Sequence, residues 1–305
     1  MRRKMDDTTL AIAISIAALV LFDLMGLIIK SLSPFYSAAE LSAYRNIFGL
    51  IPSAIALWTY AAWRDGGRSL ALRQWRLAVW RGIAVACAQL MFYLSLGVMA
   101  FATATTISYS TALFTTALAV PILGERVGFV RWIAVAIGFV GVVMIMAPGG
   151  EDMTWHALLP VGAAFLYAYA GVTSHLIDPE VPTPLFNLYS SSVAACGSIA
   201  LALALGGFAP IASLWDFGMI VLMGAFGGSA VLCLVISFRM TEPSNLAPFS
   251  YLGIPLAFLL GWLFFGEAPI DNLFPGALLI VAGGLMIVHR ERRLKRATRA
   301  AHAES

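Results

Sequence analysis

Apolar segments about as long as a bilayer is thick recur along the whole chain of 305 residues. A helix of ~20 mostly apolar residues spans the roughly 30 Å hydrocarbon core of a membrane. Only 11% of the residues are charged, whereas a soluble domain carries roughly 25%. The sequence therefore predicts an all-α integral membrane protein. The first segment, from about Leu10 to Ile29, is too long for a cleaved signal peptide and lacks a small-residue cleavage site.

The pattern predicts ten transmembrane helices, with nine as the alternative if one segment lies in the interface. We place them at residues 9–30, 37–61, 77–97, 103–123, 128–147, 155–176, 184–206, 216–237, 244–265 and 271–289. Lys and Arg gather in cytoplasmic loops of membrane proteins. With an even number of spans, all the basic clusters fall on one side: Arg2 to Lys4, Arg64 to Arg76, Arg126, Arg131, Arg239 and Arg290 to Arg299. We therefore expect both termini in the cytoplasm and the protein in a bacterial inner membrane.

The two halves of the sequence resemble each other. A shift of 142 residues places Ser108-Tyr109 on Ser250-Tyr251, Gly124-Glu125 on Gly266-Glu267, and Gly141 on Gly283, and a shift of 145 places Lys30 on His175. We predict one repeat at residues 1–149, a second at 150–292 and a basic tail at 293–305. Because each repeat has five helices, the second copy inserts upside down. Inverted repeats are typical of transporters with a site near the midplane of the bilayer.

Several short motifs resemble the EamA domain of the drug/metabolite transporter superfamily. They are Arg81-Gly82, Phe92-Tyr93, Ala102 to Thr105, Ser108 to Leu113, Gly124-Glu125-Arg126, Gly138 to Gly141 and, in the second helix, Tyr44-Arg45-Asn46-Ile47-Phe48. The resemblance covers nearly the whole chain, and the second repeat is more diverged. It implies a pocket lined by helices of both repeats. It is closest to bacterial uptake proteins for S-adenosylmethionine-like or vitamin-like metabolites, in a family that holds importers and exporters.

Asp23 and Arg45 are the charged residues that we expect to border the translocation cavity. A charge inside a bilayer costs about 2.5–3.5 kcal/mol on insertion scales, so it usually faces the bundle interior. Asp23 lies in the second half of the first helix, where it could also bind a proton, and Arg45 lies near the outer end of the second. The alternatives are a carboxylate bonded to a neighbouring helix and an Arg45 that reaches the headgroups. For Lys30 we expect the headgroups.

Polar side chains with aromatic neighbours predict a pocket for a small polar or ring-bearing molecule. The candidates, besides Asp23 and Arg45, are Gln89, Tyr93, Ser108, Tyr109, Tyr167, Asn187, Ser250 and Tyr251. Their alternative role is hydrogen bonding between helices, at about 0.6 kcal/mol for each bond. Gly224 and Gly228 form a small-residue motif for packing inside the molecule or, alternatively, for a homodimer face.

Other function classes have little support in the sequence. The cysteines Cys87, Cys196 and Cys233 lack metal-ligand spacing, and no phosphate-binding loop or dinucleotide fingerprint occurs. We expect no cofactor, no metal and no catalytic residue. The net charge of +3 is explained by topology rather than nucleic-acid binding.

The sequence thus predicts a secondary transporter that moves a small polar or amphiphilic metabolite by alternating access, driven by a gradient or by exchange. The substrate candidates are an S-adenosylmethionine-like compound, a vitamin and an amino acid. The alternatives within the class are an exporter of amino acids or drugs and a lipid flippase. Outside it stand a membrane enzyme and a structural subunit. The substrate, the direction, the coupling ion and the oligomeric state stay open.

Overall fold

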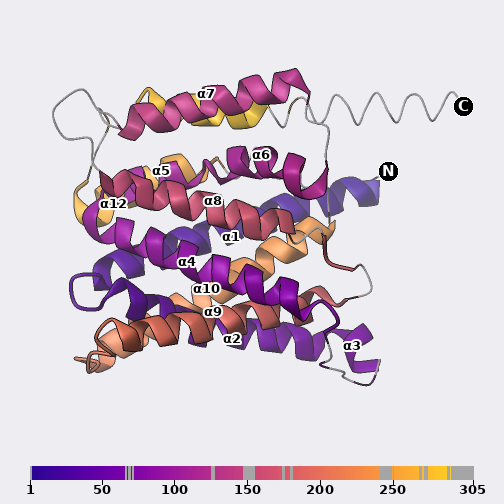
Figure 1. Ribbon diagram of the computed structural model, residues 1–305, viewed down its shortest axis with the longest axis vertical. Helices are drawn as coiled ribbons and strands as arrows, with labels where there is room; N and C mark the ends of the chain where they lie inside the picture. Colours follow the sequence, from indigo (N-terminus) through magenta and orange to yellow (C-terminus); the bar gives the residue numbers. More distant parts are fainter. Residues whose placement is uncertain are drawn as a thin grey trace, which may run out of the picture.

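The structure, a computed structural model, is a bundle of helices that run alongside one another (Figure 1). It describes residues 2–65, 67, 70, 72–124, 128–146, 155–173, 176–178, 181–240, 249, 251–267, 270, 274–286 and 289, and no strand occurs among these residues. The first half holds α1 (Arg2–Leu32), α2 (Ala38–Thr59), α3 (Ala61–Asp65), α4 (Trp75–Val98), α5 (Phe101–Ser108), α6 (Thr111–Leu123) and α7 (Phe129–Met146). The second holds η1 (Trp155–Ala157), α8 (Leu158–Thr173), α9 (Thr183–Ala204), α10 (Leu214–Met240), α12 (Gly253–Phe265) and a helix at Gly276–Met286.

Helices long and apolar enough to cross a membrane account for six stretches of the described chain. They are Thr9–Leu32, Trp75–Val98, Phe101–Leu123, Trp155–Thr173, Pro184–Ala204 and Leu214–Leu234. Three shorter apolar helices are Trp132–Ile145, Gly253–Phe265 and Gly276–Met286. Each of the ten predicted ranges therefore contains helix, while the count of ten spans and the orientation stay predictions.

The predicted helix at 103–123 is two helices, α5 and α6, that meet at Tyr109 and Ser110. Hydroxyl groups favour a bend here, because Ser and Thr side chains can bond to helix carbonyls and bend the backbone. Ser108 Oγ donates to the Ala104 carbonyl at 3.0 Å, and Thr111 Oγ1 donates to the Ser108 carbonyl at 2.7 Å. Phe101–Leu123 still forms one stretch long and apolar enough to cross a membrane, as predicted, with a break between α5 and α6 that was not predicted.

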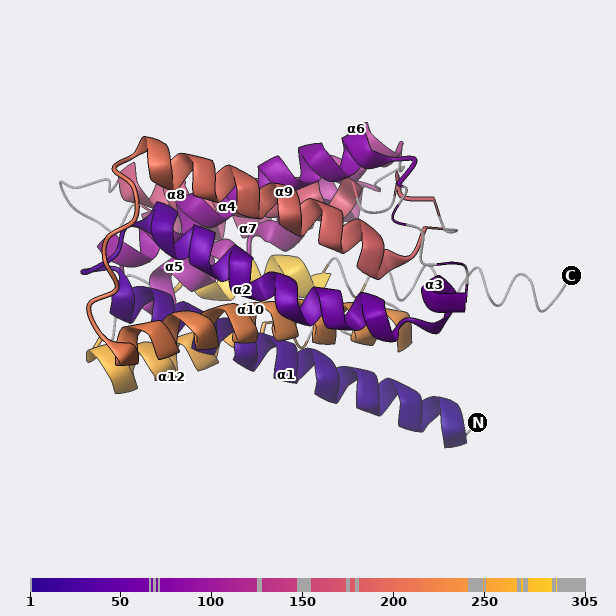
Figure 2. The ribbon, with the colours of Figure 1, turned by 90° about the horizontal axis from the view of Figure 1, so that it is seen from below.

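The two halves are interleaved rather than separate. Along the bundle, α1 packs on α10, α10 on α2, α2 on α9, α9 on α4, α4 on α8, and α8 on α6. Figure 2 shows the same order, with α1, α10 and α12 on one side, α4, α8 and α9 on the other, and α2 between them. First-half and second-half helices therefore alternate, so that polar side chains on α2 and α4 meet the other half directly.

Some local features of the first half recur in the second half at positions 142 residues later. α6 and α12 both have 13 residues and end at glycines in the left-handed region, Gly124 with φ 70° and Gly266 with φ 65°. A Cβ on Gly141 would lie 2.5 Å from the Gly276 carbonyl oxygen, and one on Gly283 would lie 2.6 Å from that of Ala134. Since Ala134 and Gly276 differ by the same 142 positions, the shift relates local structure as well as sequence.

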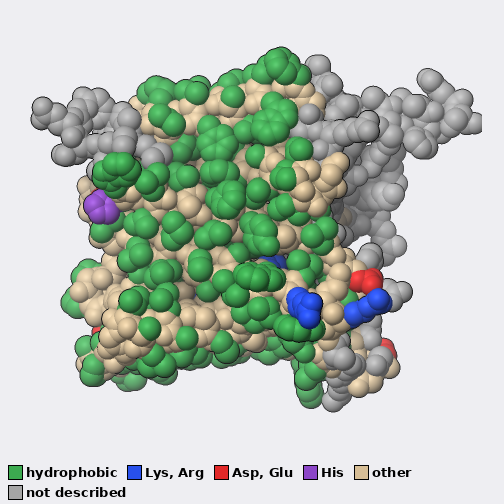
Figure 3. All heavy atoms as spheres, in the orientation of Figure 1, with side chains coloured by type: hydrophobic (Ala, Val, Ile, Leu, Met, Phe, Trp, Pro, Cys, Tyr) green, Lys and Arg blue, Asp and Glu red, His purple; other side chains and the backbone are tan. Residues whose placement is uncertain are grey.

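The surface suits contact with lipid. Figure 3 shows hydrophobic side chains over most of one face, while the described Lys, Arg, Asp and Glu side chains lie mainly toward its margins. Large apolar side chains point outward, among them Trp80, which is 64% exposed, and Leu263, which is 65% exposed. In water such a continuous apolar surface would favour aggregation, whereas hydrocarbon solvates it.

Glycines bring α10 against α2. A Cβ on Gly224 would overlap Phe48, and one on Gly228 would lie 2.7 Å from Pro52 Cγ and 2.9 Å from the Gly49 carbonyl oxygen. Of the two roles considered for this glycine pair, the structure shows packing inside the molecule.

We predict that Gly224→Ala destabilises the protein by about 1–3 kcal/mol, the usual cost of overpacking. The matched control is Gly218→Ala on the same helix, where a Cβ would meet nothing within 4 Å. The control is expected to melt at or slightly above the wild-type temperature, because Ala is the better helix former. Thermal unfolding in detergent measures both, and equal melting temperatures for the two variants would contradict the packing argument.

Candidate substrate-binding site

A buried hydrogen-bond network joins α2, α4 and α9 in the middle of the interleaved helices. Gln89 Oε1 accepts from Asn46 Nδ2 at 2.7 Å and from Ser42 Oγ at 3.3 Å. Asn46 Nδ2 also donates to Ser198 Oγ at 3.1 Å. All four residues are buried. Gln89, predicted to contact substrate, is thus held by the interhelical bonding that was its alternative role.

Arg45 extends this network toward the second half. Its Nη1 donates to Asn46 Oδ1 at 3.0 Å, while its Nε is buried without a hydrogen-bond partner. The guanidinium lies against Gly227 of α10, where a Cβ would be 2.8 Å from Nε. It is close enough to interact electrostatically with Tyr93 on α4 and Tyr167 on α8. The structure therefore places a half-bonded guanidinium between α2 and α10, one helix from each half.

Asp23 lies on α1 with only 4% of its surface exposed. Its Oδ2 is buried and has no hydrogen-bond partner. Its carboxyl group is close enough to Tyr109, in the turn between α5 and α6, to influence that residue electrostatically. Because Asp23 forms no ion pair among the described residues, neither Arg45 nor Lys30 neutralises it directly.

Tyr109 and Tyr251 meet where the two halves touch. Their ring centroids are 6.3 Å apart. The Tyr109 hydroxyl lies against Gly253 at the start of α12, and the Tyr251 hydroxyl lies against Gly284 of the last helix. Any side chain at these glycines would displace a phenol. The two tyrosines that the 142-residue shift aligns in the sequence are therefore also neighbours in space.

The other predicted site residues differ in their surroundings. Tyr93 is buried and its hydroxyl has no hydrogen-bond partner, whereas Tyr167 is half-buried. Ser108 is bonded to its own helix at Ala104, and Asn187 Nδ2 donates to Ser53 Oγ at 3.4 Å. Ser250 lies outside the described residues. The predicted site residues thus form two groups of neighbours. Asp23, Tyr109 and Tyr251 form one group, and Arg45, Tyr93 and Tyr167 form the other.

Sequence reasoning missed several polar residues of this region. Buried hydroxyls without a partner occur at Thr105, Thr106, Ser110 and Ser190. Such atoms in a native structure call for a bound water or ligand, because an unpaired buried polar group is costly. The run of hydroxyl residues from Thr103 to Thr111 could have pointed to the first three of these residues. Asn46 could have been found from its spacing of four residues from Ser42, which puts both on one helix face.

Lys30 is a correction to the sequence analysis. We expected its ammonium at the headgroups, whereas in the structure it forms an ion pair with Glu267, Nζ to Oε1 at 2.7 Å. The side chain is only 11% exposed. The acidic partner comes from the second half, 237 positions away, so no local sequence pattern announced it.

Within the described ranges, no three His, Cys, Asp or Glu side chains lie close enough together to hold an ion. Cys87 and Cys196 are exposed, Cys233 is half-buried, and all three are free thiols.

Comparison with known proteins gives relatives with transport functions. The chain is 35% identical over 175 residues to a riboflavin transporter of Rhizobium johnstonii, covering 57% of each chain. It is 30% identical over 193 residues to an S-adenosylmethionine uptake transporter of Rickettsia bellii, covering 63% of this chain and 65% of that one. The matches thus span about three fifths of these relatives. One crystal structure shares the fold at a TM-score of 0.64 and 20% identity, over 94% of this chain and 99% of the other.

The sequence profile of the EamA-like transporter family matches residues 9–147 and again residues 154–289. These two segments together cover most of the chain and correspond to the interleaved halves of the bundle. The protein is therefore a member of the EamA-like transporter family.

Proposed function

We propose that this protein is a secondary transporter that binds a small polar metabolite between its two halves and carries it across the bacterial inner membrane. One observation carries the proposal: Asp23 and Arg45, an acidic and a basic group, form no ion pair with each other, and each has a buried atom without a hydrogen-bond partner. Uncompensated charges are expensive inside a membrane. A substrate with complementary groups would compensate them.

The arrangement of the helices supports alternating access. First-half helices alternate with second-half helices along the bundle, and the 142-residue shift relates matching contacts at Gly141 and Gly283. Two copies of one unit inserted in opposite directions have two nearly equivalent packings, which open the site to opposite sides. The proposal therefore includes ten spans, repeats at residues 1–149 and 150–292, and both termini in the cytoplasm.

The charges favour a substrate with a cationic and an anionic end. S-adenosylmethionine has an ammonium and a sulfonium that suit the Asp23 carboxylate, and a carboxylate that suits the Arg45 guanidinium. Riboflavin would instead use the phenols of Tyr93, Tyr109 and Tyr251. Both compounds are named for relatives of this chain. Of the two, the unpaired charges favour the zwitterion.

We predict that Asp23→Asn reduces uptake of radiolabelled S-adenosylmethionine by at least about tenfold, because a bond to a charged group contributes roughly 1.5–3 kcal/mol. The variant should reach the membrane in normal amounts, since the amide has the shape of the carboxylate. Uptake is measured in proteoliposomes, with Asp65→Asn as the control, because Asp65 is an exposed acid on α3. Wild-type uptake in Asp23→Asn would remove this carboxylate from the mechanism.

Substrate binding can be tested separately by thermal unfolding. A ligand present at about 100 times its Kd stabilises the folded protein by roughly 2.7 kcal/mol. We expect S-adenosylmethionine to raise the melting temperature of the wild type, to raise it less in Arg45→Gln, and to act fully on Arg64→Gln, whose side chain is 51% exposed. Stabilisation by riboflavin alone would instead assign the site to an uncharged ring. No shift with either compound would argue against both substrates.

A further inference from the structure

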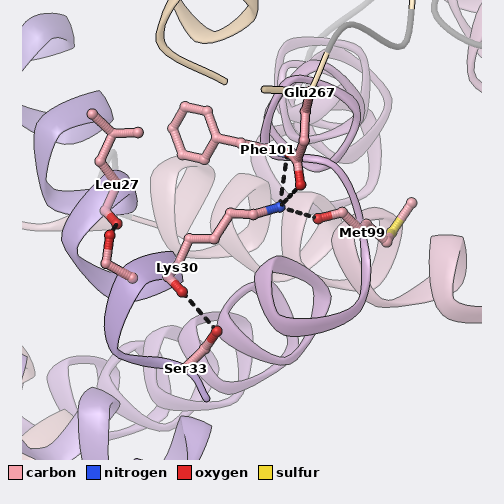
Figure 4. Close-up of polar contacts among 7 residues, drawn as sticks. Leu27, Lys30, Ser33, Met99, Phe101 and Glu267 are labelled. Carbon is pink, nitrogen blue, oxygen red and sulfur yellow. Dashed lines mark hydrogen bonds and ion pairs between the residues drawn. The ribbon is translucent and has the colours of Figure 1, made fainter. Parts of the chain in front are cut away.

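The ion pair of Lys30 and Glu267 ties α1 to the segment that follows α12 (Figure 4). The Lys30 ammonium lies 2.7 Å from Oε1 and donates to Oε2 at 2.9 Å, so both carboxylate oxygens are engaged. Lys30 is in the last turn of α1, and Glu267 comes directly after Gly266, the left-handed residue that ends α12. The bond therefore joins the two segments that match the family profile.

The same two side chains also form hydrogen bonds with the ends of two helices. The Lys30 ammonium donates to the carbonyl of Met99, the residue that ends α4, at 2.6 Å. Glu267 Oε2 accepts from the amide of Phe101, the first residue of α5, at 2.9 Å. A cation at a helix C-terminus and an anion at an N-terminus are both favourable. Four interactions thus converge where α1, the α4–α5 link and α12 meet.

A depression of about 480 Å³ opens onto this ion pair. Its walls include Ser33, Gly97, Val98 and Phe265. Lys30 and Glu267 contribute side chains that are 11% and 28% exposed, so the carboxylate is the more accessible of the two. Fully buried Phe101 packs beside Phe265 with ring centroids 6.5 Å apart. Lys30, Glu267 and Phe265 therefore line the depression, and the buried Phe101 ring lies next to Phe265.

A polar group without a hydrogen-bond partner lies farther along α5 from this ion pair. Thr105 is one helical turn beyond Phe101 on α5, and its buried Oγ1 has no hydrogen-bond partner. The Lys30 end of α1 is the end away from the N-terminus (Figure 1). The other ion pair among the described residues, Arg64 with Asp65, joins sequence neighbours and is exposed. Removing the Arg64 charge is therefore a suitable control, because this ion pair does not connect two helices of the bundle.

We propose that the Lys30–Glu267 pair is a latch that closes the transport pathway at the end of the bundle away from the N-terminus. The latch rests on the proposed function, because a transporter must open this end in one of its two states. Opening requires α1 and α12 to separate here, and separation breaks a bond that spans the two halves. Loss of either charge then shifts the population toward the state that is open on this side.

The test measures access to the interior and needs no substrate. The reporter is Thr105→Cys in a protein whose three cysteines are replaced by alanine. A membrane-impermeant maleimide is added to spheroplasts and, separately, to inside-out vesicles. If the state open on this side is a minor state populated at ~0.1–10%, its population can still increase greatly. Lys30→Met and Glu267→Gln should therefore each raise the labelling rate by about tenfold or more, from one side only, whereas Arg64→Gln should leave it unchanged.

Two results would overturn the latch. Unchanged labelling together with a lower melting temperature would mean that the pair only stabilises the fold, and equal increases from both sides would indicate local unfolding. Glu267→Gln retains an oxygen that can accept from the Phe101 amide, so it carries the test if Lys30→Met does not fold. Because labelling is independent of uptake, a latch without transport of any tested compound would count against the proposed function alone.

Discussion

The close contact of α10 with α1 and α2 is the constraint on which the rest of the structure depends. Helices in a bilayer gain little from hydrophobic burial against each other, so they associate through close packing at small residues. Gly224 and Gly228 admit Phe48 and Pro52, and Gly227 leaves room for the Arg45 guanidinium. With α10 inserted between α1 and α2, the first half cannot form a separate lobe. The site must then be built from both halves.

The partners of each buried ionisable group indicate its role, because the membrane interior has no water that could compensate a charge. Lys30 is neutralised by Glu267 and bonded to a helix-end carbonyl. Arg45 is bonded on one side by Asn46 and left unpaired at Nε. Asp23 has an oxygen with no partner at all. The three groups thus differ in how many of their polar atoms have a partner. Lys30, which is fully paired, belongs to the proposed latch, whereas Arg45 and Asp23, which are not, belong to the proposed binding site.

Much of the fold could be predicted because hydrophobic length and helical periodicity are local properties. The ranges of the helices followed from apolar segments, and the relation between Tyr109 and Tyr251 followed from equal spacing in the two halves. The break between α5 and α6 was missed, although the hydroxyl residues that favour a bend are visible around Ser108 and Thr111. The assignment of Gln89 to substrate was made without knowledge of its bonds to Ser42 and Asn46, which come from another helix.

The sequence by itself determined that this chain is helical, that it belongs in a membrane, that its halves are related and that Asp23 and Arg45 are unusual. These conclusions rest on composition, spacing and the cost of charge in hydrocarbon. Only the tertiary structure decided that Lys30 is paired, that Arg45 lies between α2 and α10 and that the two glycines of α10 face α2. Those outcomes depend on which helices become neighbours. Contacts between residues up to 237 positions apart are set by the packing of the whole bundle, which no local pattern encodes.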